Sequence, residues 1–133
     1  MQRSYFTSWL AYQKAHTLAS SICRLTASFP VHERYALSDQ IRRSSRSVCA
    51  NLAESYAKRR YPKHFLAKLT DAAAENYESQ VWLSFAREHG YLNDEYYASY
   101  QRACEEVGKL LSYMMNHPDQ YLPGIAHTKA TRS

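Results

Sequence analysis

The chain has 133 residues, enough for one domain with a buried core, and its net charge is +5. Its hydrophobic (45%) and charged (22%) contents are close to the globular average, which excludes collagen, wholesale disorder and a membrane bundle. Only three Gly and four Pro occur, too few for an all-β domain with a turn about every ten residues. We therefore expect long helices.

Four helices are predicted, and the four prolines and the first glycine lie between the segments with helical periodicity and not inside them. The first covers about 8–28, where apolar residues recur at spacings of three and four until Pro30 ends the pattern. Its predicted inner face carries Ala11, Ala15, Leu18, Ile22, Leu25 and Phe29. The second covers about 35–59, with an inner face of Leu37, Ile41, Ser45, Val48, Leu52 and Tyr56.

The third helix is expected over about 62–89 and the fourth over about 93–116. Pro62 suits a first turn, Gly90 can close the third helix in the left-handed conformation, and Asn93 can cap the fourth. The inner face predicted for the third helix carries Leu66, Leu69, Ala73, Tyr77 and Val81. The inner face predicted for the fourth carries Tyr96, Tyr100, Ala103, Val107, Leu110 and Met114.

These segments predict the architecture. Helices of this length with short connections favour an all-α fold, an antiparallel up-down four-helix bundle that forms one domain over residues 1–118. Residues 119–133 are expected to form a loose C-terminal tail. The predicted core positions are Leu18, Ile22, Ile41, Val48, Leu52, Leu69, Val107 and Leu110.

Two of the helices have a second face that a monomeric bundle would not need. The second helix carries a stripe of small residues, which would let another helix approach closely, and the third has aromatic side chains pointing away from its inner face. Alanines are also good helix formers, and scattered apolar surface residues are normal, but we favour self-association. The predicted interface residues are Ala50, Ala53, Ala57, Trp82 and Phe85.

Charge is unevenly distributed along the chain. Residues 40–68 carry eight basic residues and one acidic residue (+7), whereas residues 69–106 carry eight acidic and two basic residues (−6). Arginine-rich groups beside an aromatic residue suit phosphate contacts and base stacking. The predicted nucleic-acid-binding residues are Arg42, Arg43, Arg46, Lys58, Arg59, Arg60, Lys63 and Lys68. Alternatively, the cluster pairs with Asp71, Glu75 and Glu78 of a neighbouring subunit, or is a solvated surface.

No catalytic constellation is present in the sequence. There is no Glu-x-x-His pair of the kind that holds a di-iron site, and no HExxH, P-loop or GxSxG motif. The six His are scattered, and Cys49 has only Ser45 and Ala53 one turn away, neither of which is a base or a ligand. We therefore expect no enzymatic activity, no metal and no cofactor.

Cysteine usage and hydropathy indicate the compartment. Cys23, Cys49 and Cys104 are widely spaced and odd in number, so neither a disulfide framework nor a CxxC metal site is expected. Polar residues interrupt the N-terminal segment, and no stretch approaches the roughly 18 apolar residues of a membrane span. These features predict a cytoplasmic protein with reduced thiols and no membrane association.

The second helix contains a recognisable motif. Residues 40–54, QIRRSSRSVCANLAE, are similar to the pattern QIRRSxxSxxxNIAE of a bacterial family called four helix bundle proteins, several of which are encoded within intervening sequences of 23S rRNA genes. The resemblance covers most of residues 9–115. Further matches lie at YQKA (12–15), FP (29–30), Glu33, Tyr35, Leu37, Lys63, Phe65, Leu66, Glu78 and GYL (90–92). The chain departs from the family pattern at Ser55, Ala74 and Glu75.

The resemblance implies a non-enzymatic four-helix bundle assembled as a homopentameric ring. It also implies similarity to the accessory variability protein of diversity-generating retroelements, which binds nucleic acid and a reverse transcriptase. The leading hypothesis is thus a ring that binds RNA or DNA through the basic surface, with a protein such as a reverse transcriptase as a partner by family analogy. The alternative is a protein-binding scaffold whose charge asymmetry serves only self-assembly. Asn51 and Glu54 are expected to cap or pair locally.

Overall fold

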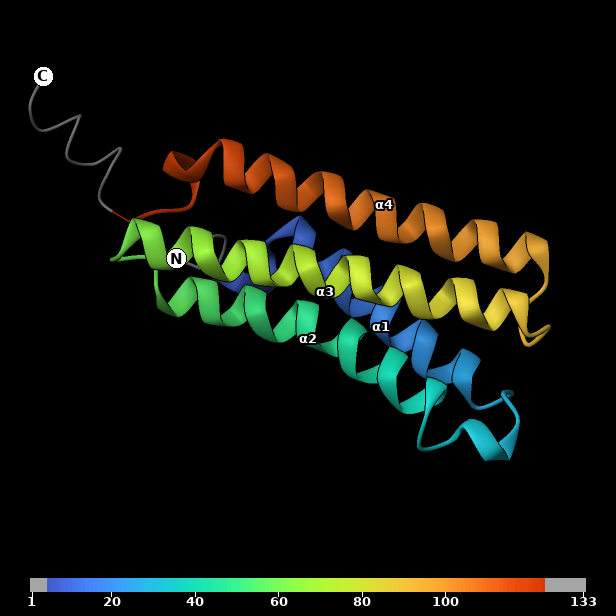
Figure 1. Cartoon of the computed structure of the whole chain (residues 1–133). Helices are drawn as coiled ribbons and strands as arrows, with labels where there is room; N and C mark the ends of the chain where they lie inside the picture. The colour runs from blue at the N-terminus through green and yellow to red at the C-terminus, as the bar shows by residue number, and fades with distance from the viewer. Residues whose placement is uncertain (1–4, 124–133) are drawn as a thin grey trace, which may run out of the picture.

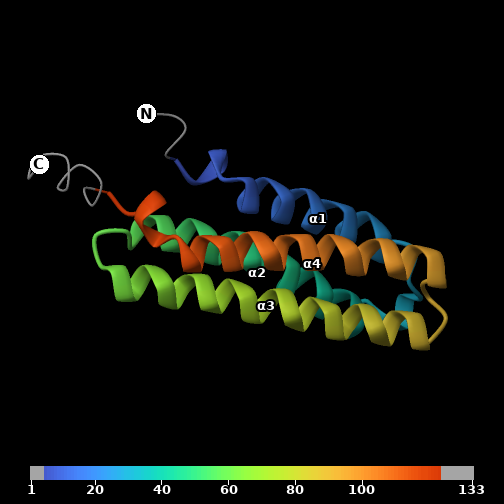
Figure 2. The ribbon, with the colours of Figure 1, turned by 90° about the horizontal axis from the view of Figure 1, so that it is seen from above.

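The computed structural model describes residues 5–123, which form four α-helices and three short 3₁₀ helices. The helices are α1 (Leu10–Thr26), α2 (Leu37–Ala57), α3 (Pro62–Glu88) and α4 (Asp94–Asn116), and the 3₁₀ helices are Phe6–Ser8, Val31–Glu33 and Pro118–Gln120. In Figure 1 the α2–α3 connection lies at one end of the molecule and the other two connections lie at the opposite end. α1 and α3 each contact both α2 and α4, and Figure 2 shows α4 running between α1 and α3. The four helices therefore enclose one common core.

Three residues that end or begin helices do so as predicted. Pro62 occupies the first turn of α3, where a missing N–H removes no helical hydrogen bond. Gly90 follows α3 with a φ of 78°, and nothing lies within 4 Å of where its Cβ would be, so backbone conformation rather than space favours glycine here. Asn93 accepts a hydrogen bond from the Tyr96 backbone N–H at 2.8 Å and caps α4.

The core contains one face of each helix. On α1 and α2 most of the predicted inner-face residues are buried, although Leu25 and Tyr56 are half-buried, and Ile22, Ile41 and Leu52 are completely buried. Of the predicted core positions, all are buried except Leu110, which is half-buried. On α4 the adjacent Leu111 takes the core position instead, because it continues the buried stripe formed by Cys104, Val107 and Met114.

The inner face predicted for α3 is correct at Leu69, which is completely buried, but wrong at Tyr77 and Val81. Tyr77 and Val81 are 69% and 48% exposed, whereas the polar residues Asn76 and Ser79 are buried. The physical reason is that α3 contacts α2 on one flank and α4 on the other, so its buried surface is broad and includes positions without apolar side chains. Both buried polar residues have hydrogen-bond partners, which removes most of the cost of burying them.

Asn76 joins α3 to α4. Its Nδ2 donates a hydrogen bond to the backbone carbonyl of Cys104 at 2.9 Å. A Cβ at Gly108 would lie 3.4 Å from the same Nδ2, so the missing side chain of Gly108 leaves room for the amide. The buried amide is therefore part of the contact between these two helices.

Small polar side chains lie at the contact of α2 with α3. Ser44 and Ser79 are both buried, and their hydroxyl oxygens are 2.8 Å apart, which makes a hydrogen bond between the helices. Ser55, about three helical turns further along α2, is also buried and donates to the carbonyl of Leu52 at 2.7 Å. Side chains this small let the two helix backbones approach closely.

The folded domain continues beyond residue 118, where it was expected to end. Leu122 is buried, and the ring of Tyr121 packs edge-on against that of Trp9 with a centroid distance of 5.7 Å. Tyr121 and Leu122 are thus packed against the core and not part of a loose tail, whereas Asp119, Gln120 and Pro123 are exposed. Residues 124–133 of the expected tail lie outside the described residues.

Candidate nucleic-acid interface

The eight basic residues predicted to bind nucleic acid do not form one surface. One group forms ion pairs on α2 and α3, a second lies beside α1, and a third lies at the α2–α3 connection. The distinction matters because a cation that already has a carboxylate partner must give it up before it can contact a phosphate.

Arg43 belongs to the ion-paired group. Its Nη1 lies 3.2 Å from Oε1 of Glu75, and its Nη2 contacts the carboxylate of Glu78. The indole Nε1 of Trp82 donates to the same Glu78 carboxylate at 3.0 Å. The charge of Arg43 is therefore compensated within the chain, by acidic residues that the alternative interpretation had placed on a neighbouring subunit.

Lys68 is the second ion-paired residue. Its Nζ lies 2.7 Å from Oε1 of Glu54 and 3.8 Å from Oδ2 of Asp71. The hydrogen bond with Glu54 raises the pKa of Lys68, so the ammonium stays charged and paired at neutral pH. Like Arg43, Lys68 is thus a poor candidate for a phosphate contact.

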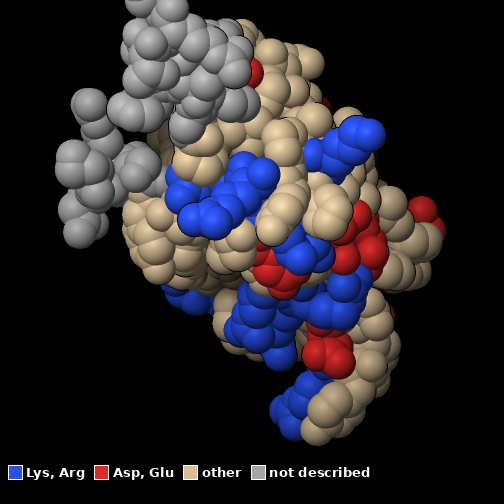
Figure 3. Space-filling model, turned by 90° about the vertical axis from the view of Figure 1, so that its left-hand side faces the viewer, with Lys and Arg blue, Asp and Glu red and all other residues tan. Residues whose placement is uncertain are grey.

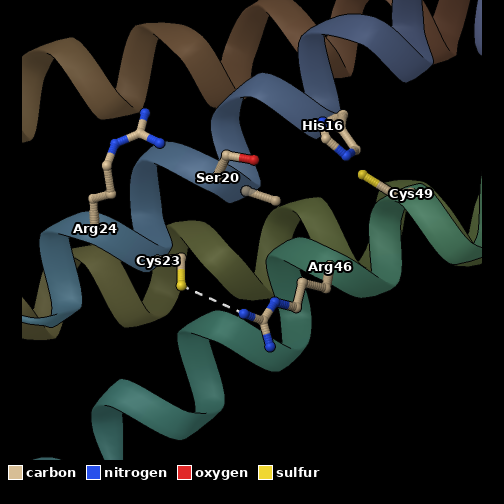
Figure 4. A pocket seen from close by; sticks show the side chains of 7 residues that line it. His16, Ser20, Cys23, Arg24, Arg46 and Cys49 are labelled. Carbon is tan, nitrogen blue, oxygen red and sulfur yellow. Dashed lines mark hydrogen bonds between the residues drawn. The ribbon is translucent and has the colours of Figure 1, made fainter.

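Arg42 and Arg46 face α1 instead of the α2–α3 connection. Nε of Arg42 donates to Oγ1 of Thr26 at 2.8 Å, and Nη2 of Arg46 lies 3.4 Å from Sγ of Cys23. Figure 4 shows the guanidinium of Arg46 directed toward Cys23. These two arginines therefore contact α1 and not the acidic residues of α3.

The other four predicted residues form what we call the loop cluster: Lys58, Arg59, Arg60 and Lys63. Lys58, Arg60 and Lys63 are exposed, and none of the four has an ion-pair partner among residues 5–123. Figure 3, which looks at the end of the bundle with the α2–α3 connection, shows that Lys and Arg cover more of this face than Asp and Glu, which lie among them. The loop cluster is therefore an uncompensated positive surface.

Aromatic rings accompany the loop cluster. The guanidinium carbon of Arg59 lies 3.7 Å from the ring centroid of Tyr56, and its Nε donates to the Tyr56 carbonyl at 3.1 Å, so the side chain is held in place. Tyr61 is 61% exposed, and its ring centroid is 5.7 Å from that of His64. An exposed ring beside fixed cations is an arrangement on which a base can stack.

The first turn of α3 adds hydrogen-bond donors. It contains no acidic residue, and Tyr61, which precedes it, provides no side-chain cap. The backbone N–H groups of Lys63 and His64 have no acceptor among the described residues. These N–H groups stand at the positive end of a helix dipole, beside the loop cluster, where they suit an anion.

The five residues predicted at a subunit interface have different environments. On α2, Ala50 and Ala57 are exposed and Ala53 is half-buried. On α3, Trp82 is half-buried against Glu78 and Phe85 is 41% exposed. The prediction missed the outward face of α3, which carries no charged residue over five turns and bears the exposed Tyr77 and Val81. Its residues are Ala67, Thr70, Ala74, Tyr77, Val81 and Ser84, and their spacing of three and four residues was the available signal.

The described residues offer little other chemistry. Burial raises the pKa of the Cys49 thiol to about 11 and that of Cys104 to about 12, so both stay protonated at neutral pH. Within residues 5–123, no three His, Cys, Asp or Glu side chains come together as a metal site would require. None of the helices in this range combines the length and apolar character needed to cross a bilayer.

Comparison with known proteins places the chain in a family. The profile of the family described as 23S rRNA-intervening sequence protein matches residues 8–113, most of the chain. The chain belongs to this family. The resemblance that the motif on the second helix indicated is thereby confirmed. A search of curated proteins found no match to the chain.

A solved structure supports the fold of this intervening-sequence protein. A protein with unknown function from the S23 ribosomal protein family of Bacteroides thetaiotaomicron VPI-5482 has a similar structure, with a TM-score of 0.73 and 26% sequence identity. The match covers 80% of this chain and 96% of that chain. The family motif over residues 40–54 forms most of α2, where Asn51 donates to the carbonyl of Ser47 at 2.9 Å and Glu54 pairs with Lys68.

Proposed function

We propose that this 23S rRNA-intervening sequence protein is a non-enzymatic RNA-binding protein that contacts the RNA backbone with the loop cluster. The observation that supports the proposal is the group of four cations without carboxylate partners at one end of the bundle. Cations of this kind release counterions from a phosphate backbone when they bind it, which makes binding favourable and dependent on salt.

Neighbouring groups add to the case for RNA. The exposed ring of Tyr61 can stack on an unpaired base, and the free N–H groups at the start of α3 can donate to a phosphate. None of these groups reads a sequence. We therefore propose binding to single-stranded RNA of general sequence, with DNA as an alternative ligand of the same surface.

The salt dependence of RNA binding tests this proposal. The triple variant Arg59→Gln, Arg60→Gln, Lys63→Gln should bind a short single-stranded RNA more weakly than the wild type. Each lost phosphate contact lowers the slope of log K against log salt by about 0.7 on a single strand, so a loss of about two units is expected. Fluorescence anisotropy at several salt concentrations, starting near 50 mM, measures this slope for each protein.

A second triple variant controls for net charge. Arg34→Gln, Arg102→Gln, Lys109→Gln removes the same charge at exposed positions outside the loop cluster and should retain most of the slope. A wild type that binds neither RNA nor DNA at low salt would contradict the proposal. If log K depends equally on log salt in the loop variant and in the wild type, the proposal is also contradicted, and the alternative of a protein-binding scaffold is favoured.

We also propose that the chain assembles with itself, as a homopentameric ring. The support is the outward face of α3, where the exposed Tyr77 and Val81 lie on a surface without charge. A ring would repeat the loop cluster in every subunit, and the salt dependence of RNA binding would increase with the number of clusters in contact.

Light scattering tests the assembly. Val81→Glu should reduce the measured mass toward that of one 15.4 kDa chain, because it places a charge on the proposed contact without disturbing the core. Ser112→Glu adds the same charge at an exposed position of α4 and should leave the mass unchanged. A wild-type protein that is monomeric at micromolar concentration would refute the ring.

A further inference from the structure

A hollow of about 350 Å³ lies between α1 and α2, away from the loop cluster. It is lined by His16, Ala19, Ser20, Cys23, Arg24, Arg46 and Cys49. Its size falls within the range of small-ligand sites, and none of its lining residues is acidic. In Figure 4 Arg46 points across the hollow toward α1, His16 lies near Cys49, and Arg24 extends away from Arg46.

The charge around this hollow is not compensated. Residues 5–32, which include the whole of α1, contain no Asp or Glu. Of the two acidic residues of α2, Asp39 stands in the first turn and Glu54 is paired with Lys68. Neither Arg24 nor Arg46 has an ion-pair partner among the described residues.

Arg46 also lies one helical turn from Arg42. Like charges at this spacing destabilise a helix, so the pair carries an electrostatic cost that an anion would relieve. Arg42 uses its Nε on Thr26, whereas the only hydrogen bond of Arg46 within the described chain goes to a sulfur atom, a weak acceptor. Most of the donors of Arg46 are therefore available to a ligand.

Further donors line the same hollow. The hydroxyl of Ser20 has no hydrogen-bond partner among residues 5–123, and the ring nitrogens of His16 have none either. A guanidinium provides paired N–H groups that match the oxygens of a phosphate. The hollow thus combines positive charge, unused donors and an absence of acidic lining residues.

We propose that the hollow between α1 and α2 is a binding site for a phosphate group, held principally by Arg46 with Ser20 and His16 as further donors. The phosphate belongs to a free small molecule, such as inorganic phosphate or a nucleotide, or to an RNA backbone. The site is separate from the loop cluster and does not depend on the function proposed above.

Isothermal titration calorimetry at fixed ionic strength tests the site. The probes are inorganic phosphate, adenosine monophosphate, and a short single-stranded RNA without terminal phosphates. The wild type should bind at least one probe saturably, and Arg46→Gln should weaken that binding about tenfold or more because it removes a charged hydrogen-bond donor. Arg24→Gln should have a smaller effect, since its side chain extends away from Arg46.

Two variants serve as controls. Arg102→Gln removes one positive charge from an exposed position of α4 and should bind the probes as the wild type does. The variant Arg59→Gln, Arg60→Gln, Lys63→Gln removes three of the four cations of the loop cluster, and its binding of the probes should still depend on Arg46. Because Arg46 is exposed, its substitution should not unfold the protein, and circular dichroism checks this.

The probes distinguish the two sources of phosphate. Arg46-dependent binding of inorganic phosphate or adenosine monophosphate identifies a free small molecule. The Arg46→Gln substitution is also combined with the triple variant of the loop cluster. If RNA is then the only probe whose binding is weakened by Arg46→Gln, the ligand is backbone phosphate. The proposal is overturned if Arg46→Gln and Arg102→Gln behave alike with every probe, including the case in which no probe binds.

Discussion

Replacing Leu111 with alanine should lower the free energy of unfolding by about 2–5 kcal/mol, because the side chain is completely buried and its loss leaves a cavity. Replacing the adjacent Leu110 with alanine should cost less than about 1.5 kcal/mol, since that side chain is only half-buried. The two substitutions delete the same atoms from neighbouring positions of α4. Urea denaturation of both variants, with similar m-values, measures the difference.

The comparison tests the rotation of α4 about its axis. If Leu110→Ala were the more destabilising of the two, α4 would be turned by about one residue from the orientation described. The sequence-based assignment of Leu110 to the core would then be restored.

Replacing Asn76 with aspartate should lower the free energy of unfolding by about 3–5 kcal/mol at neutral pH. The amide that donates to the Cys104 carbonyl would become a buried carboxylate facing an acceptor. Burial disfavours the charged form and would raise the folded-state pKa of the introduced carboxylate above its unfolded value near 4. The penalty should therefore grow as the pH rises above about 4 and be smallest at lower pH.

A matched substitution controls for the change of amide to acid. Asn93→Asp, at the cap of α4, should be nearly neutral, because a carboxylate accepts the hydrogen bond from Tyr96 as well as an amide does. Thermal and urea unfolding between about pH 4 and 7 compares the two variants with the wild type. A destabilisation of Asn76→Asp that does not depend on pH would show that the introduced side chain reaches solvent.

The helices and two of their faces could be predicted from the sequence because the signals were local. Proline, glycine and asparagine mark helix ends by their own backbone and capping chemistry, as Pro62, Gly90 and Asn93 do. α1 and α2 each bury an apolar stripe that a period of 3.6 residues reveals. The pattern finds the apolar part of the buried surface, whereas the buried Ser44 and Ser55 of α2 lie outside the predicted face.

The face of α3 could not be predicted in this way. Its buried positions include Asn76 and Ser79, which no hydrophobic pattern selects, and its outward positions include Tyr77 and Val81. On α4 two adjacent leucines were equally plausible by pattern alone, and packing against α1 and α3 decided between them. Which face of a helix is buried depends here on neighbours that are distant in the sequence.

Only part of the candidate interface could be predicted from the sequence, for a similar reason. The charge excess of residues 40–68 was visible, but Arg43 and Lys68 are paired with acidic residues that fall on the facing helix. The loop cluster was contained in the prediction, whereas Arg24 and Ser20 of the α1–α2 hollow were not. Counting charges along the chain does not show which of them face each other.

The hydrogen bond between Ser44 and Ser79 also determines which alignment of α2 and α3 is allowed. If α3 slid by one turn in one direction, Glu75 would take the place of Ser79 and a carboxylate would be buried against α2. A slide in the other direction would bring Leu83 to the same place, and its bulk would force the helices apart. Two hydroxyl groups, which add little apolar area, thereby disfavour both of these misaligned pairings.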